Sequence, residues 1–191
     1  MAARLGADAV GLVFAESPRR IDLASAAEIS AHLPPFVSRV GLFVNADAAT
    51  VREAWRTVPL DLVQLHGDES PAFCAELGDL RTMKAFRIGS RRDLEEVFEY
   101  DSVQAILLDS KVKGVRGGSG HAFPWEWLDR WTPHKPWVLA GGLTPDNVEE
   151  AVSRWSPYAV DVSSGVESEP GVKSQEKIRR FMEAVRRARL S

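Results

Sequence analysis

Short apolar runs alternate with amphipathic segments along almost the whole chain, and this alternation limits the possible folds more than any other feature. Most runs are continuously apolar, which is typical of strands buried on both faces of a parallel sheet. Regular alternation of strands and helices predicts an α/β fold with right-handed crossovers. The predicted strands are residues 9–14, 37–44, 62–65, 82–86, 105–108, 137–140 and 159–162. The predicted helices are residues 23–33, 48–57, 71–77, 91–99, 125–130, 147–154 and 174–189.

Composition predicts a single domain over residues 1–191. The chain is 45% hydrophobic and 27% charged, which provides enough apolar side chains for one core. A formal charge of -3 argues against a nucleic-acid partner, because nucleic-acid-binding surfaces are strongly basic. No apolar stretch is long enough to span a bilayer, and a single cysteine excludes an intramolecular disulfide. We therefore predict a cytoplasmic protein with no membrane and no nucleic-acid partner.

Two glycine-containing loops follow the last two predicted strands. Glycine lets the backbone approach an anion closely, and outward-pointing amide groups in such loops bind phosphate. In (β/α)8 barrels the loops after strands 7 and 8 form a phosphate site. We therefore predict a phosphorylated small-molecule ligand, and the alternative is a pair of ordinary turns between strand and helix. The predicted phosphate-binding residues are Gly141, Gly142, Ser163, Ser164 and Gly165.

Asp109 follows the predicted strand 105–108 and precedes the longest irregular stretch, residues 110–123. The carboxyl ends of barrel strands face the active site. Partial burial there favours a protonated carboxyl that acts as a general acid. The stretch after Asp109 is glycine-rich and basic, which predicts a loop that closes over an anion. The alternatives are a loop carboxylate and a plain surface loop.

The residues before the first predicted strand have the pattern of the last turn of a helix. Gly6 is expected to end that helix, because glycine readily takes the left-handed conformation of a C-terminal cap. A helix tail without a preceding strand is unusual in a repeat of strands and helices. We therefore expect the first β-strand and most of the first helix of the fold to be absent from residues 1–191.

Taken together, these stretches closely resemble the phosphoribosylanthranilate isomerase family of tryptophan biosynthesis, from Gly6 to the C-terminus. Any single match is weak, but their order and spacing over nearly the whole chain are specific. The matching stretches are Gly6-Ala7-Asp8-Ala9-Val10-Gly11-Leu12-Val13-Phe14, Ser17-Pro18-Arg19, Leu33-Pro34-Pro35-Phe36-Val37, Val40-Gly41-Leu42-Phe43-Val44-Asn45, Val63-Gln64-Leu65-His66-Gly67-Asp68-Glu69, Lys84-Ala85-Phe86, Leu107-Leu108-Asp109, Gly117-Gly118-Ser119-Gly120, the two glycine loops and Pro170-Gly171-Val172-Lys173.

The resemblance implies a (β/α)8 TIM-type barrel and a cofactor-free intramolecular oxidoreductase, an aldose-ketose isomerase. Such enzymes carry out the Amadori rearrangement of N-(5-phosphoribosyl)anthranilate to 1-(2-carboxyphenylamino)-1-deoxyribulose 5-phosphate. A general acid protonates the ribose ring oxygen and opens the ring, and a general base then removes the C2 proton of the resulting Schiff base. Family members begin with a strand reading Lys-Ile-Cys-Gly, whose cysteine is the base. This sequence has no such segment, so we expect residues 1–191 as written to be inactive.

Four side chains are expected to act in the site. By resemblance, Asp109 is the general acid and Arg19 contacts the anthranilate portion, where a guanidinium suits an aromatic carboxylate. His66 is expected to donate to the substrate or to hold the acid in place. Asp161 is expected either to hydrogen-bond a ribose hydroxyl or to pair with Lys84 as a structural element.

The remaining candidate residues are expected to have no catalytic role. Cys74 lies inside the predicted helix 71–77 as a small buried hydrophobe, so it cannot replace the missing base. His32, His121 and His134 have no spacing typical of a metal site. We therefore expect no metal and no cofactor, and a monomer or homodimer that binds a phosphorylated small molecule.

Several interpretations stay open at this point. The sequence starts at an internal methionine or is a fragment, or the gene is truncated with little activity, or the chain is a binding module. The family-like stretches after Gly6 are all intact, which favours a sequence that starts at an internal methionine or is a fragment. The functional alternatives are a non-catalytic phosphate-ligand-binding remnant and another sugar-phosphate barrel enzyme, such as indole-glycerol-phosphate synthase or a histidine-pathway isomerase.

Overall fold

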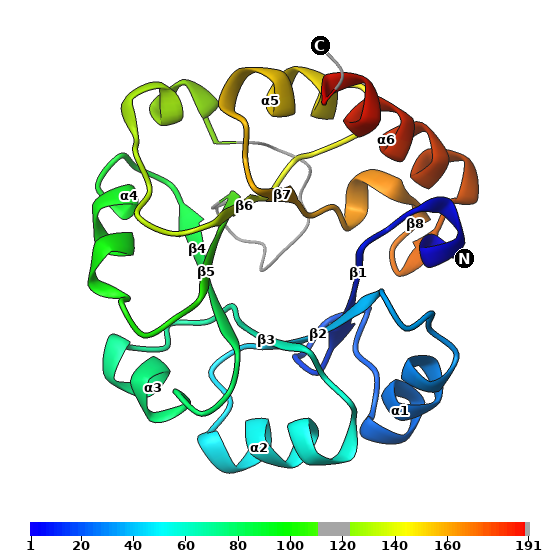
Figure 1. Cartoon of the computed structure of the whole chain (residues 1–191), viewed down its shortest axis with the longest axis vertical. Helices are drawn as coiled ribbons and strands as arrows, with labels where there is room; N and C mark the ends of the chain where they lie inside the picture. The colour runs from blue at the N-terminus through cyan, green and yellow to red at the C-terminus, as the bar shows by residue number, and fades with distance from the viewer. Residues whose placement is uncertain (111–122, 190–191) are drawn as a thin grey trace. The chain divides into compact units, whose positions relative to one another are not determined.

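The computed structural model describes residues 1–110 and 123–189, and its architecture is the predicted α/β fold (Figure 1). Strands β1 to β7 form one sheet in their order along the chain, with parallel pairing as between β1 and β2. The strands are β1 (Ala9–Val13), β2 (Ser38–Phe43), β3 (Leu62–Leu65), β4 (Thr82–Ile88), β5 (Ala105–Ser110), β6 (Trp137–Leu139) and β7 (Ala159–Val160). A separate antiparallel hairpin consists of β8 (Glu167–Glu169) and β9 (Val172–Lys173).

Helices connect these strands. The α-helices are α1 (Leu23–Ala31), α2 (Ala48–Thr57), α3 (Pro71–Glu76), α4 (Asp93–Glu96), α5 (Val148–Trp155) and α6 (Gln175–Ala188). The 3-10 helices are η1 (Ala2–Leu5), η2 (Val97–Glu99), η3 (Trp125–Arg130) and η4 (Ser164–Val166). None of the helices in the described ranges is long and apolar enough to cross a membrane.

The chain divides into two compact units. The first unit comprises Met1–Ala85 and Tyr100–Gln104, and the second comprises Phe86–Glu99 and Ala105–Ser191. Strand β4 begins in the first unit and ends in the second. A single domain over residues 1–191 stays a prediction.

Side-chain caps start the helices of the first unit. The carboxylates of Asp22 and Asp47 each accept the N–H of the residue three positions on, at 2.7 Å. These N–H groups favour the charged carboxylate and hold the pKa of both aspartates below its ordinary value. At α3 the cap is the Ser70 hydroxyl, and Pro71 occupies the first helical position, where a missing N–H costs nothing. Because these signals are local, the predicted helix starts agree with the structure.

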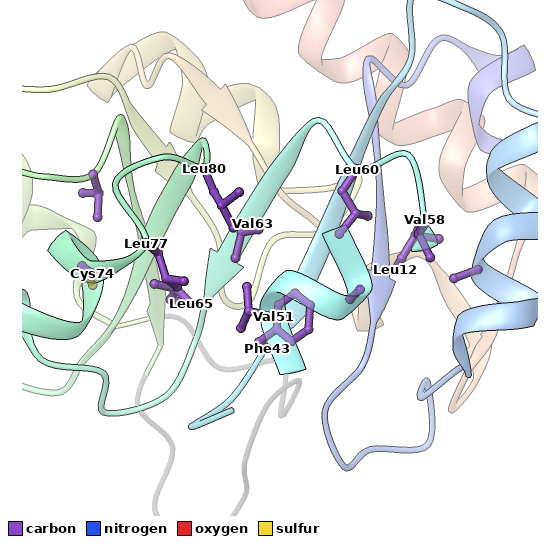
Figure 2. Close-up of a cluster of buried hydrophobic side chains, with 13 residues drawn as sticks. Leu12, Phe43, Val51, Val58, Leu60, Val63, Leu65, Cys74, Leu77 and Leu80 are labelled. Carbon is purple, nitrogen blue, oxygen red and sulfur yellow. The ribbon is translucent and has the colours of Figure 1, made fainter. Parts of the chain in front are cut away.

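The core of the first unit lies between its strands and helices (Figure 2). Leu12, Phe43 and Leu65 come from β1, β2 and β3, and all are at most 2% exposed. Val51 of α2 and Cys74 of α3 are fully buried in the same cluster. This packing of helices against parallel strands leaves the carboxyl ends of the strands to carry loops.

The second unit is built around β5. Its Ile106, Leu107 and Leu108 are all fully buried. Helices α5 and α6 lie against each other (Figure 1), and α6 buries Ile178 and Phe181, three positions apart on one face.

Some predicted boundaries differ from the structure. The helix predicted at 125–130 is the 3-10 helix η3, in which Trp127 N–H donates to the Pro124 carbonyl. The helix predicted at 91–99 is split into α4 and η2, and the β8–β9 hairpin was not predicted. The predicted N-terminal helix end is confirmed as η1, which ends at Gly6 with a φ of 102°. Most of the predicted closing loop, residues 111–122, lies outside the described residues.

Candidate active site

Asp109 and the first glycine loop meet at the carboxyl ends of β5 and β6. Asp109 is half-buried, and its Oδ1 accepts the N–H of Ser110 at 2.7 Å. Gly141 has a φ of 75°, and a Cβ on it would collide with the Asp109 carboxylate and with Ser110. Only glycine fits there, because both the conformation and the space exclude a side chain. The predicted acid and the predicted phosphate loop are therefore in direct contact.

Asn147 holds the shape of the first loop. Its Oδ1 accepts the N–H of Thr144 at 2.8 Å, and its Nδ2 donates to the carbonyl of Gly142 at 2.9 Å. Asn147 precedes α5, so the helix and the loop are held together. Gly142 also has a positive φ, of 73°. The sequence indicated these glycines but not the asparagine, which carried no pattern of its own.

The second glycine loop packs on the first. A Cβ on Gly165 would collide with the carbonyl of Leu143, which lies between Gly142 and Thr144. The backbone N–H groups of Gly142, Ser164 and Gly165 belong to these two loops. Closely packed glycine loops of this kind are typical of anion sites. The arrangement of the second unit therefore suits a phosphate group.

Lys173 adds a positive charge beside the second loop, and sequence reasoning gave it no role. Its Nζ donates to the carbonyl of Ser163 at 2.9 Å and lies 3.2 Å from the Ser163 hydroxyl. The same Nζ forms an ion pair of 2.9 Å with Glu167. The β8–β9 hairpin brings Lys173 back to this position, helped by Gly171 with a φ of 86°. The only sequence signal was the matching stretch Pro170-Gly171-Val172-Lys173.

Asp161 follows β7 rather than lying within the last strand as predicted, because β7 ends at Val160. Its N–H still donates to the carbonyl of Leu139 at 2.9 Å, so the backbone continues the sheet for one residue. The side chain is exposed in this structure. Its two predicted roles, with the ribose or with Lys84, stay predictions.

Arg19 lies at the carboxyl end of β1 in the first unit. The loop after β1 folds back, with a bridge between Val13 and Arg20 and an N–H of Arg19 that donates to Ser17 Oγ at 2.9 Å. Arg19 is half-buried, whereas Arg20 is exposed and lies 3.8 Å from Glu16. Arg20 is therefore the surface arginine of the pair.

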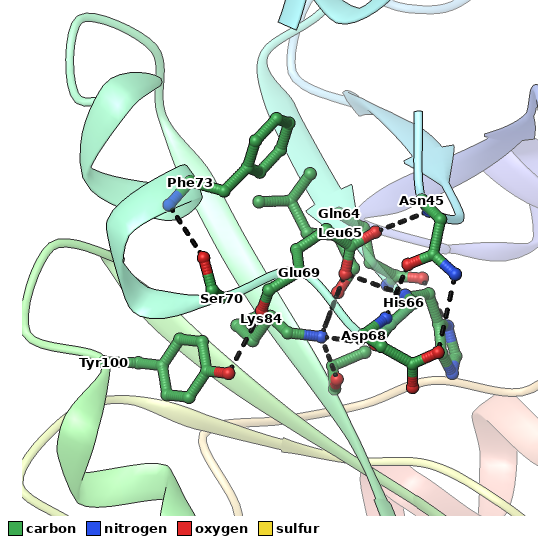
Figure 3. A network of polar contacts seen from close by, with 12 residues as sticks. Asn45, Gln64, Leu65, His66, Asp68, Glu69, Ser70, Phe73, Lys84 and Tyr100 are labelled. Atoms are coloured by element: carbon green, nitrogen blue, oxygen red, sulfur yellow. Dashed lines mark hydrogen bonds and ion pairs between the residues drawn. The ribbon is translucent and has the colours of Figure 1, made fainter. Parts of the chain in front are cut away.

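His66 follows β3 at the same edge of the first unit (Figure 3). Its Nδ1 lies 3.2 Å from the Oε1 of Gln64, a side chain that is only 4% exposed. The Gln64 amide therefore restrains the imidazole ring. A buried ion pair between Glu69 and Lys84 lies beneath this loop, and it was not predicted. Lys84 was named in the sequence analysis only as an alternative partner of Asp161, and Glu69 had no sequence signal beyond its place in a matching stretch.

Metal ligands do not gather in the described ranges. Among those residues no group of three His, Cys, Asp or Glu side chains is placed to hold a metal ion.

The Cys74 thiol is protonated and unreactive at neutral pH. Its side chain is fully buried, and burial raises the pKa of the thiol from 9.0 to about 11. A neutral, inaccessible thiol is a poor proton acceptor and a poor nucleophile. Cys74 therefore cannot act as a catalytic base.

We expect a thiol reagent at pH 8 to modify Cys74 at least about 100-fold more slowly in the folded than in the unfolded protein, since two pKa units reduce the thiolate about 100-fold. The unfolded thiol releases its proton at lower pH, so this group destabilises the fold as pH rises from about 9 to about 11. Denaturant melts over this range should show a loss that Cys74→Ala removes. Fast modification of the folded protein would contradict the assignment.

We expect Gly165→Ala to weaken binding of inorganic phosphate about 10-fold or more, because the new Cβ must push the two loops apart. The matched control is Gly11→Ala in β1, where an added Cβ meets nothing within 4 Å. NMR titrations with phosphate measure both variants. Equal affinity in Gly165→Ala and wild type would remove the second loop from the site.

The fold and the contacts of the second unit define a class: a parallel α/β protein with a carboxylic acid beside a pair of packed glycine loops at the carboxyl ends of its strands. The sequence model of N-(5'-phosphoribosyl)anthranilate isomerase matches residues 1–184. The chain belongs to this family of isomerases of tryptophan biosynthesis.

Relatives and solved structures agree with this family. The isomerase of Magnetococcus marinus is 50% identical over 184 residues, which are 96% of this chain and 87% of that protein. The isomerase of Stutzerimonas stutzeri is 48% identical over 188 residues, 97% of this chain and 90% of the relative. The crystal structure of the Thermotoga maritima isomerase matches with a TM-score of 0.90 and 40% identity, over 97% of this chain and 91% of that one.

A further solved structure of the isomerase, described as a complex with reduced 1-(o-carboxyphenylamino)-1-deoxyribulose 5-phosphate, matches with a TM-score of 0.83 and 38% identity. It covers 97% of this chain and 90% of the other. The indole-glycerol-phosphate synthase alternative receives no support from these relatives.

Proposed function

We propose that residues 1–191 supply the phosphate site, the general acid and the anthranilate-binding residues for the Amadori rearrangement of N-(5'-phosphoribosyl)anthranilate. The observation that carries the proposal is the contact of Asp109 with Gly141, together with the packing of Gly165 on Leu143. One phosphorylated ligand held by the paired loops would present its sugar to the carboxyl next to them. The product-like ligand of the solved relative is a phosphorylated sugar derivative, which supports the same ligand class here.

Asp109 is the general acid of this proposal. Its Oδ1 accepts the N–H of Ser110 at 2.7 Å, which fixes the carboxyl group beside the first glycine loop. Protonation of the ribose ring oxygen breaks its bond to C1 and produces the Schiff base. The opened sugar then has an acidic C2 proton, whose removal leads to the ketose product.

The paired loops bind the substrate phosphate and take no part in the chemical steps. The N–H groups of Gly142, Ser164 and Gly165 bind phosphate oxygens. Lys173 does not contact the phosphate but orients the Ser163 side chain. Binding energy from this remote phosphate fixes the sugar beside the acid.

The other predicted side chains serve recognition. Arg19 forms paired hydrogen bonds with the anthranilate carboxylate, as its planar guanidinium permits. His66 contacts the substrate through the ring that Gln64 restrains. Asp161 hydrogen-bonds a ribose hydroxyl, which its exposed position after β7 supports.

The finer fold proposal is a (β/α)8 barrel in which β1 to β7 are strands 2 to 8. A strand preceding them carries the cysteine that acts as base, as the family resemblance implies. The matches to solved family structures support this correspondence. We also infer a cytoplasmic enzyme. We infer a monomer or a homodimer, since a solved Thermotoga maritima relative is described as monomers generated from a dimeric isomerase.

Ligand binding tests the proposal without requiring turnover. We expect reduced 1-(o-carboxyphenylamino)-1-deoxyribulose 5-phosphate to bind the protein more tightly than inorganic phosphate in isothermal titration calorimetry. An Arg19→Met variant should lose part of this difference and keep its affinity for inorganic phosphate. Equal affinity for both ligands in the wild type would leave only a phosphate-binding function.

A further inference from the structure

A buried ion pair lies under the loop that carries His66 (Figure 3). The Nζ of Lys84 in β4 lies 3.0 Å from Oε2 of Glu69, which follows β3, and each side chain is only 3% exposed. Both charges are in the first unit, away from bulk water. Charges in such surroundings act strongly on any peptide group that they contact.

Lys84 holds the peptide groups on both sides of His66. Its ammonium donates to the carbonyl of Leu65 at 3.2 Å and to the carbonyl of Gly67 at 2.8 Å. It also donates to the carbonyl of Ala85 at 2.9 Å, which ties the ammonium to its own strand. His66 stands between the first two carbonyls, so its backbone is fixed from both ends.

Glu69 completes the restraint with its two carboxylate oxygens. Oε2 accepts the N–H of Gly67 at 2.8 Å, and Oε1 accepts the N–H of Asn45 after β2, also at 2.8 Å. Asn45 takes the left-handed conformation, with a φ of 52°, and its Oδ1 accepts the N–H of Asp68 at 2.7 Å. A Cβ on Gly67 would collide with Asn45, so the two loops are in close contact.

A buried ion pair is a poor way to gain stability, because removing two charges from water costs about as much as their attraction returns. An apolar pair of the same volume would serve the core equally well. The five hydrogen bonds of this pair given above go to backbone groups, and three of them hold the peptide groups of Leu65 and Gly67 that flank His66. The geometry therefore favours a role in shaping the loop.

We propose that Lys84 and Glu69 are positioning residues for His66. They set the backbone on either side of the histidine, and Gln64 sets its ring, so that the imidazole has one orientation toward the ligand. This inference rests on the proposed function, in which His66 contacts the substrate. Neither charged residue touches the ligand in this proposal.

The test compares three variants with the wild type. Lys84→Met removes the ammonium, and Lys84→Met with Glu69→Met removes both charges while keeping apolar volume. Arg39→Met is the matched control, because it removes an ion pair of 3.2 Å with Asp61 before β3, in the same unit, whose side chains are 17% and 44% exposed. The readouts are the NMR signals of the His66 ring, amide exchange at Gly67 and Asp68, and calorimetric affinity for the reduced product analogue.

We expect both Lys84 variants to shift the His66 ring signals and to raise exchange at Gly67 and Asp68 selectively, relative to Val63 and Leu65 in the strand. Affinity for the analogue should fall about 10-fold, as is typical when the partners that orient a histidine are lost. Arg39→Met should change none of these. A general loss of stability would raise exchange in the strand as well.

Unchanged ring signals and loop exchange in the folded double variant would overturn the proposal. Failure of the double variant to fold would overturn it too, because the pair would then be required for folding. His66→Ala separates this inference from the proposed function: unchanged analogue affinity in that variant would refute the role of His66 in binding. The His66 ring signals of the two Lys84 variants still test the positioning in that case.

Discussion

A polypeptide of residues 1–191 alone is expected to show no isomerase turnover, whereas the same residues preceded by a strand with a cysteine are expected to be active. The rearrangement needs an acid and a base, and the proposed base is not among these residues. Their one cysteine, Cys74, is fully buried with a thiol pKa of about 11. Product formation from N-(5'-phosphoribosyl)anthranilate measures both polypeptides.

The control for this first prediction is the extended polypeptide with serine in place of the added cysteine, which should be as inactive as residues 1–191. Turnover by residues 1–191 would show that another group removes the C2 proton. Thermal melts with the reduced product analogue test the non-catalytic alternative: stabilisation by the analogue together with an inactive extended polypeptide would support it, and a polypeptide of residues 1–191 that the analogue does not stabilise would exclude it.

In the active polypeptide, Asp109→Asn is expected to lower kcat by about 10²–10⁴-fold, the usual contribution of a general acid. Asparagine has nearly the same shape and keeps an oxygen for the Ser110 N–H, but it has no acidic proton. Affinity for the reduced product analogue should therefore stay within about 3-fold of wild type. Steady-state kinetics and calorimetry on the same preparation separate the two effects.

Asp8→Asn is the matched control for Asp109, because Asp8 is an exposed aspartate immediately before β1, at the opposite end of a strand. Its kcat should equal that of wild type. An Asp109→Asn variant that keeps wild-type kcat would assign the acid to a different group, whereas a variant that loses affinity as well would give Asp109 a role in binding.

Local signals explain why so much of the fold was predictable. Asp22, Asp47 and Ser70 begin their helices through hydrogen bonds to residues three positions away, so the cap and its partner lie in one short window. Where a predicted strand boundary differs from the structure, the boundary depends on contacts with residues far away in the sequence. Residues after β7 were predicted as strand, but β7 pairs with only two residues of β6, which are Val138 and Leu139.

In the candidate site too, residues with a local sequence pattern were predicted and residues that depend on distant contacts were not. Asp109 and the glycines were predicted because strand ends and glycine loops have a local pattern, and family resemblance added Arg19 and His66. The roles of these residues remain predictions. Asn147, Lys173, and the pair of Lys84 with Glu69 had no such pattern, because their partners are brought to them by loop, hairpin or sheet contacts.

The sequence by itself determined the parallel α/β fold, the starts of the first-unit helices, and the presence of a carboxylic acid and two glycine loops after predicted strands. These follow from apolar periodicity, caps and glycine, which act over a few residues. Only the tertiary structure decided that Gly141 leaves space for Asp109 and that Lys84 lies against the backbone around His66. Contacts between residues far apart in the chain depend on strand register and packing, which bring polar groups together at distances that no local pattern encodes.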